Sequence, residues 1–128
     1  MSYFDCVRQF HKKVLGIEDT KPTLEPPVTL DQRVKFMEEE ITELMEAYVA
    51  NDMVGVADAL ADLVYVAVGT AYIMGIPFDE VFKVVHAANM QKVRGITKRG
   101  MLYDAVKPAG WVGPEAQIET ILDAASKS

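Results

Sequence analysis

Five glutamates stand within nine positions of FMEEEITELMEA, residues 36–47, a stretch that otherwise has the pattern of an amphipathic helix. Two further carboxylates, Asp58 and Asp62, stand one helical turn apart in a later and strongly apolar segment. Carboxylate oxygens without sulfur ligands suit hard cations such as Mg²⁺ or Mn²⁺, which keep several waters and share substrate phosphates. A glutamate run alone is more typical of a solvated acidic helix face. The interpretation as a metal site therefore depends on the second pair.

That second pair needs an explanation, because an unpaired carboxylate is costly to bury. Asp58 and Asp62 lie on a helix that is apolar nearly all round, and the neighbouring helices offer few basic residues. The alternative is that this stripe, which continues through Tyr65, Gly69 and Tyr72, faces a wet groove.

Polar residues also interrupt the apolar stripe of a later helix. Asn89 and Lys92 project along the continuation of that stripe, which predicts that they point inward. An amide and an ammonium directed at a carboxylate cluster would complete a site for a metal-bound phosphate. The alternative is a single salt bridge between the lysine and a carboxylate at a helix end.

A di-iron carboxylate bundle is a rival interpretation of acids on bundle helices. It requires a Glu-x-x-His pair, and the residues three before His11 and His86 are both basic. We therefore set this rival aside and assign neither histidine a catalytic role.

Helical periodicity predicts helices over residues 2–15, 30–50, 54–74, 77–93 and 114–124. Gly16 is expected to cap the first, and Thr29 with Gln32 forms a capping-box signature for the second. The core face predicted for the second helix is Val34, Met37, Ile41, Leu44 and Tyr48. Residues 95–114, rich in glycine and proline, predict an arm with a possible short hairpin. The fold class is all-α, a bundle of four to five helices with a C-terminal arm.

Composition limits the environment and the partners. The chain has 128 residues, half of them hydrophobic, which suits a single domain over residues 1–128. One cysteine and no basic leader followed by an apolar run predict a cytoplasmic protein. The longest apolar run, residues 63–74, is too short to cross a bilayer, so no membrane partner is expected. A net charge of −6 argues against nucleic acid, and a polyanionic small molecule would bind only together with cations.

Three motifs in order resemble the all-α NTP pyrophosphohydrolases, the MazG-like group that includes dimeric dUTPases and phosphoribosyl-ATP pyrophosphohydrolase. EEITE at residues 39–43 matches the EExxE motif of that group. DALADLVYVAVGTAYIMGI resembles the helix with the second acidic motif, and VFKVVHAANMQKV resembles the Asn-x-x-Lys helix. FHKKVLG and KPAGW, near the two ends, are also similar to segments of the MazG-like branch.

The resemblance implies metal ligands and phosphate-binding residues at defined positions. It implies that Mg²⁺, or Mn²⁺ in its place, is held by Glu39, Glu40, Glu43 and Asp62, and that the phosphates contact Asn89 and Lys92. One position departs from the motif: the usual Glu three residues before the aspartate is Ala59 here, and Asp58 is the nearest acid. Residues four apart on a helix share a face, so Asp58 still lies on the same face as Asp62 and is a candidate replacement ligand.

The implied reaction is attack of water on the α-phosphorus of a nucleotide, giving a nucleoside monophosphate and pyrophosphate. Glu40 or Glu43 would orient or deprotonate the water, and spacing does not distinguish them. The main expectation is hydrolysis of a (deoxy)nucleoside triphosphate in nucleotide-pool house-cleaning, with a dUTP-like substrate as one option. The alternatives are phosphoribosyl-ATP hydrolysis in histidine biosynthesis and a non-catalytic metal-binding or interaction module.

A homodimer or homotetramer is also expected. Four modest helices cannot easily cover a third helix that is apolar on nearly every side. The resemblance implies the same. Lys107 and Trp111 are candidates to reach a site on the partner chain, because a lone tryptophan in an arm rich in glycine and proline is unusual for a linker, and Lys107 is then a phosphate-binding residue. The alternative is that they pack on their own chain.

Overall fold

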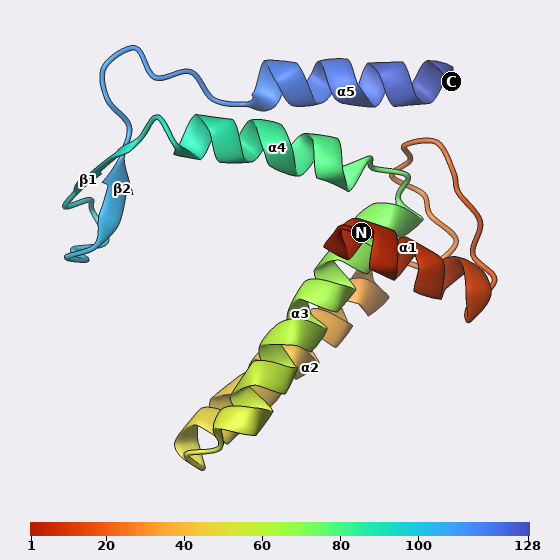
Figure 1. The fold of residues 1–128 in the computed structure, drawn as a ribbon, viewed down its shortest axis with the longest axis horizontal. Coiled ribbons are helices and arrows are strands. Elements are labelled where there is room, and N and C mark those ends of the chain that lie inside the picture. The colour runs from red at the N-terminus through yellow and green to blue at the C-terminus, as the bar shows by residue number, and fades with distance from the viewer. The chain divides into compact units, whose positions relative to one another are not determined.

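The computed structural model describes all residues from Met1 to Ser128, and the chain forms two compact units, Met1–Phe78 and Asp79–Ser128. Five helices and one two-stranded hairpin make up these units, so the fold class is all-α (Figure 1). The single domain over residues 1–128 stays a prediction, and each unit is described by itself.

The first unit contains α1 (Tyr3–Lys13), α2 (Leu30–Val49) and α3 (Met53–Ile73). α2 and α3 form a helical hairpin, and α1 packs against α3 (Figure 1). The hairpin turn is tight because Asn51 adopts a left-handed backbone with φ 55°. These three helices agree with the predicted ranges to within two residues at each end.

Side-chain caps start each of these helices. Ser2 and Asp5 form a complete capping box on α1, and the hydroxyl of Thr29 accepts a hydrogen bond from the Gln32 amide on α2. The Asp52 carboxylate accepts a bond from the Gly55 amide at 3.0 Å, which begins α3 directly after the turn. The capping signature at Thr29 is confirmed, whereas the caps of α1 and α3 were not predicted.

The face of α2 that turns to α3 differs from the predicted core stripe. Val34, Ile41 and Tyr48 are 40%, 49% and 74% exposed, so the prediction is wrong for these three residues. Arg33, by contrast, is only 8% exposed, and Glu40 is half-buried. The seam between the two helices therefore carries polar side chains, and much of the apolar stripe lies outside it.

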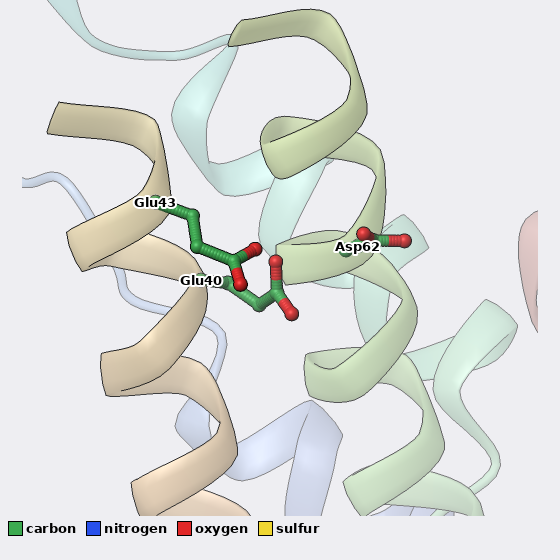
Figure 2. Close-up of side chains that lie close together, drawn as sticks. All are labelled: Glu40, Glu43 and Asp62. Atoms are coloured by element: carbon green, nitrogen blue, oxygen red, sulfur yellow. The ribbon is translucent and has the colours of Figure 1, made fainter. Parts of the chain in front are cut away.

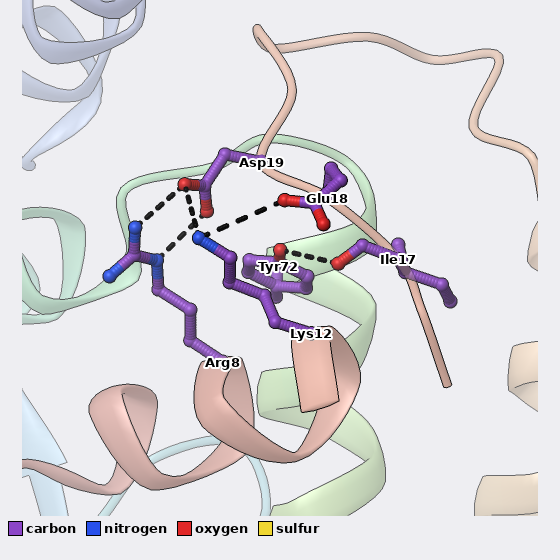
Figure 3. Close-up of polar contacts among 6 residues, drawn as sticks. All are labelled: Arg8, Lys12, Ile17, Glu18, Asp19 and Tyr72. Atoms are coloured by element: carbon purple, nitrogen blue, oxygen red, sulfur yellow. Dashed lines mark hydrogen bonds and ion pairs between the residues drawn. The ribbon is translucent and has the colours of Figure 1, made fainter. Parts of the chain in front are cut away.

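The chain between α1 and α2 is tied to both α1 and α3 (Figure 3). Asp19 accepts hydrogen bonds from the guanidinium of Arg8 at 2.6 and 2.8 Å and from Lys12 at 3.3 Å. The Tyr72 hydroxyl of α3 donates to the Ile17 carbonyl at 2.8 Å. Burial, followed by the nearby Asp19 charge, raises the pKa of Tyr72 to about 12, so this donor keeps its proton.

α3 is long and apolar enough to cross a membrane by length and composition, with a mean hydropathy of 1.6. It is nevertheless the helix against which both α1 and α2 pack. It also carries Asp58 and Asp62, and ionised side chains are expensive inside a bilayer. We therefore describe α3 as the central helix of the first unit.

The second unit contains the hairpin of β1 (Val93–Gly95) and β2 (Asp104–Val106) and ends with α5 (Glu115–Lys127). The unit begins with α4 (Phe78–Asn89), which precedes the hairpin and ends four residues earlier than predicted. The Lys92 amide donates to the Asn89 carbonyl in a turn, and the extended backbone of β1 follows at once. Lys92 consequently lies in this turn and not on a helix. The possible hairpin in the arm is confirmed.

Candidate metal centre

Three carboxylates of the first unit converge on one side of the α2–α3 hairpin. Glu40 and Glu43 extend from adjacent turns of α2, and Asp62 extends from the facing part of α3 (Figure 2). One oxygen of each lies within 4.8 Å of the others. We call Glu40, Glu43 and Asp62 the acidic cluster.

The helices bring these residues together by simple periodicity. Glu40 and Glu43 are three residues apart on α2, which places them on the same face one turn apart. The tight turn at Asn51 then folds α3 back along α2, which brings Asp62 close to this pair.

Glu40 is the most perturbed member of the acidic cluster. Its Oε2 atom is buried and has no hydrogen-bond partner. Burial is the largest cause that raises the pKa of Glu40, followed by a hydrogen bond shared with Glu43. The negative charges of Asp62 and Asp58 raise the pKa further. Without a cation, this arrangement favours a proton on Glu40.

The donor set fits a hard divalent cation. It consists only of carboxylate oxygens, and one of these, Glu40 Oε2, is buried with no partner in the protein. A cation would satisfy this oxygen and offset the repulsion among the three carboxylates. Glu40, Glu43 and Asp62 are therefore the residues that would hold Mg²⁺ or Mn²⁺.

Two of the predicted ligands lie outside the acidic cluster. Glu39 is exposed and lines an open groove on α2, together with residues such as Lys35 and Glu46. Asp58 is exposed one turn before Asp62, and it contributes to the field on Glu40 without joining the close group.

The predicted phosphate-binding lysines meet at a tryptophan in the second unit. The ammonium groups of Lys92 and Lys107 lie 5.1 and 5.0 Å from the centre of the Trp111 ring. Trp111 Nε1 donates to the Ala88 carbonyl of α4 at 2.8 Å, which fixes the ring. Neither lysine forms an ion pair with a carboxylate. Asn89 is exposed at the end of α4.

The sequence did not reveal that Trp111 joins the two lysines. The only signal was a lone tryptophan in an arm rich in glycine and proline, which is an unusual place for a large aromatic residue. Lys92 lies in a turn just beyond the early end of α4, whereas the periodicity had placed it on the helix.

Comparison with known proteins identifies one family. The family model described as Phosphoribosyl-ATP pyrophosphohydrolase matches residues 7–89. The match includes the acidic cluster and Asn89 but stops before Lys92, Lys107 and Trp111. No curated protein matches the chain.

Proposed function

The chain belongs to the phosphoribosyl-ATP pyrophosphohydrolase family of hydrolases that act on phosphoric anhydrides, and on this premise we propose that it releases pyrophosphate from a phosphoribosyl-ATP-like nucleotide. The observation that carries the proposal is the acidic cluster, which is the kind of site that binds the cations accompanying a phosphate chain. In the reaction, water attacks the α-phosphorus, and the bond from this phosphorus to the bridging oxygen breaks. The products are a nucleoside monophosphate derivative and pyrophosphate.

The residues of the acidic cluster divide the work. A bound Mg²⁺ would supply neutralisation of the phosphate chain and activation of water. Glu40, Glu43 and Asp62 would hold the cation, and Glu40 would also accept the proton that the attacking water loses. Glu40 must be ionised to act as a base, so activity falls at acidic pH.

A (deoxy)nucleoside triphosphate is the second candidate substrate. The family match ends at residue 89, so Lys107 and Trp111 are not part of what the family model describes. An arm outside the match would supply a different nucleotide preference. House-cleaning of the nucleotide pool would be the corresponding function.

A substrate panel tests both candidates. Phosphoribosyl-ATP, the common ribo- and deoxyribonucleoside triphosphates and dUTP are each incubated with the full chain and Mg²⁺, and pyrophosphate and orthophosphate are measured separately. We expect pyrophosphate release from at least one substrate and none in excess chelator. Release of orthophosphate, or full activity in chelator, would contradict the proposal.

We also assign Asn89, Lys92 and Lys107 to the phosphates of the substrate. The two ammonium groups gather on one ring without a carboxylate, so an anion would reduce their mutual repulsion. Trp111 is the sole tryptophan, so its fluorescence reports directly on ligands that bind beside Lys92 and Lys107. Pyrophosphate should change the emission of the wild-type protein and have much less effect on Lys92→Met or Lys107→Met. An equal change in all three proteins would contradict the assignment.

The proposed active species is a homodimer or homotetramer. Only 22% of the 18-residue apolar window of α3 is buried within the chain. Large apolar side chains on α2 and α3 remain exposed, namely Ile41, Met45, Tyr48, Val49, Met53, Val54, Leu60 and Val64. Their extent favours a second copy that contributes the same face. Sedimentation at micromolar concentration tests this: a fully active species of 14.2 kDa would refute it.

We further propose a cytoplasmic location and a small-molecule nucleotide as the only other partner. The net charge of −6 disfavours nucleic acid, and the family consists of hydrolases of a small metabolite.

A further inference from the structure

Arg33 is a buried charge with no carboxylate partner. It is 8% exposed, and none of the ion pairs of the protein includes it. A buried guanidinium without a counter-charge is costly, and an apolar side chain of similar size would avoid this cost. The presence of an arginine here calls for a role that an apolar residue would not fill.

The guanidinium instead joins α2 to α3 through neutral acceptors. Arg33 Nε donates to Thr70 Oγ1 at 3.1 Å, and Nη2 donates to the Val66 carbonyl at 3.1 Å. The Thr70 hydroxyl donates in turn to the same Val66 carbonyl at 2.7 Å. The three hydrogen bonds form a closed ring, which we call the arginine contact. Because it uses two nitrogens of a planar fork, it holds the two helices in one relative position.

Gly69 gives the arginine contact its space. A Cβ atom at this position would lie 2.8 Å from Arg33 Nη2 and 2.7 Å from His11 Cε1. His11 is 2% exposed and closes the other side of the space from α1. The guanidinium therefore fits closely and has little freedom to move along α3.

The arginine contact and the acidic cluster lie on the same seam. Arg33 precedes Glu40 by seven residues, which is two helical turns, so both side chains leave the same face of α2. On α3, Val66 and Thr70 follow Asp62 by one and two turns. A slip of one residue between the helices would shift Glu40 against Asp62 by about 1.5 Å. Such a shift is large for Mg²⁺, which demands near-ideal oxygen distances of about 2.1 Å.

We propose that Arg33 is a positioning residue of the metal centre: its fork of bonds to Thr70 and Val66 sets the register of α2 against α3 and so places Glu40 and Glu43 against Asp62. The proposal rests on the proposed function, which requires a divalent cation at the acidic cluster. The packing of apolar side chains along the hairpin does not fix the register with the same precision, because it lacks directional bonds.

The test measures Mn²⁺ binding to the full chain without nucleotide, by the loss of the free Mn²⁺ paramagnetic resonance signal. Arg33→Met removes the fork and the buried charge but keeps a long apolar side chain. We expect its Mn²⁺ affinity to fall by about tenfold or more, as for other residues that orient metal ligands. Its melting temperature without metal should be equal to or above that of the wild type. Wild-type Mn²⁺ affinity in this variant would overturn the proposal.

Further variants keep the test decisive. If Arg33→Met does not fold, Arg33→Lys replaces it, because lysine keeps the charge and loses the fork. Weakened Mn²⁺ binding in Arg33→Lys supports the proposal, and unchanged binding overturns it. Thr70→Ser keeps the hydroxyl and is the matched control, with wild-type affinity expected. A loss of stability without a change in Mn²⁺ affinity would mean a structural role alone.

The same experiment separates this inference from the proposed function. If the wild-type protein does not bind Mn²⁺ at the acidic cluster, the proposed function itself fails. If the wild type binds and Arg33→Met binds equally well, only the positioning role fails.

Discussion

The acidic cluster and the arginine contact are two ends of one helical seam. They differ in whether the buried charge finds hydrogen-bond partners within the protein. At one end, three carboxylates lie close together, no ion pair of the protein includes them, and Glu40 keeps a buried oxygen without a hydrogen-bond partner. At the other end, two turns away, the Arg33 guanidinium has no carboxylate, yet it donates to Thr70 and to the Val66 carbonyl.

Only the arginine end is complete within the protein itself. Arginine and glutamate on the same face of α2 could have neutralised each other across a helical turn, but their spacing of two turns keeps them apart. The guanidinium is served by neutral acceptors, so the arginine contact needs nothing from outside. The acidic cluster lacks a positive partner, and an external cation is what would complete it.

The largest expected effect comes from Glu40→Gln, which breaks the acidic end while keeping side-chain volume. We expect turnover to fall by about a hundredfold or more, because the variant loses both a ligand and a base. The metal-free protein should become more stable, since a carboxyl whose pKa is raised by burial and like charges is replaced by a neutral group. Steady-state pyrophosphate release and thermal melting measure the two outcomes.

Glu46→Gln is the matched control for Glu40→Gln. Glu46 lies on the same helix in the open groove on its exposed side, so this variant should keep wild-type turnover and stability. Equal activity of Glu40→Gln and Glu46→Gln would place the chemistry somewhere else on the molecule.

Asp62→Asn and Asp58→Asn test which aspartate of α3 is a metal ligand. Asp62 belongs to the close group, whereas Asp58 is exposed and acts on Glu40 only through its charge. We expect the Mg²⁺ concentration for half-maximal activity to rise by about tenfold or more in Asp62→Asn. The rise in Asp58→Asn should be much smaller. A larger effect at Asp58 would mean that it replaces the missing ligand at Ala59.

Gly69→Ala disturbs the arginine end and leaves every carboxylate in place. The added Cβ would lie 2.8 Å from Arg33 Nη2 and 2.7 Å from His11 Cε1, so a buried contact must shift. Overpacking of this kind costs about 1–3 kcal/mol of stability. Urea unfolding measures the loss, and a variant as stable as the wild type would show that the contact is loose.

The smallest effect concerns the pH dependence of stability at the arginine end. His11 Nδ1 contacts the Val7 carbonyl at 2.8 Å, so it carries the proton, and the buried Nε2 has no partner. Burial lowers the pKa of His11 below 6.5, and the Arg33 charge lowers it further. Because the unfolded chain takes up this proton first, the stabilisation is present above the ordinary pKa and is lost as the pH falls below it.

His11→Phe tests this contribution. Thermal melting of the metal-free protein between about pH 8 and about pH 5 should show a decline of a few degrees that the variant lacks. Glu40 acts in the opposite direction over part of this range, because its pKa is raised, so the difference between the two profiles isolates the histidine. Parallel profiles would show that His11 does not titrate differently on folding.

The resemblance to a known family, more than helical spacing, pointed to the acidic end. It implied ligands at Glu39, Glu40, Glu43 and Asp62, and the structure brings the last three together. Their role as metal ligands stays a prediction. Helix ranges were also predictable, because caps and breaking residues such as Thr29 and Gly75 are local signals. A helix boundary can be predicted from sequence where the residues that set it are neighbours along the chain.

The arginine end was not predicted, for a physical reason. Helical periodicity finds the most apolar face of α2, but it does not say which neighbour covers this face, and Val34, Ile41 and Tyr48 proved exposed. Arg33 is polar and lies outside the apolar stripe, so the periodicity made no prediction about it. The available signal was its spacing of seven residues from Glu40, together with Gly69 and Thr70 in a strongly apolar helix. The end of α4 was missed because hairpin pairing, a non-local interaction, takes the chain from residue 93 onward.

The most direct measurement is a crystal structure of the full chain soaked in Mn²⁺, with anomalous data collected at the manganese edge. The account predicts an anomalous peak between α2 and α3, about 2.1 Å from oxygens of Glu40, Glu43 and Asp62. No peak at saturating Mn²⁺, or a peak coordinated by other residues while this cluster stays empty, would contradict the assignment of the acidic cluster as the metal centre.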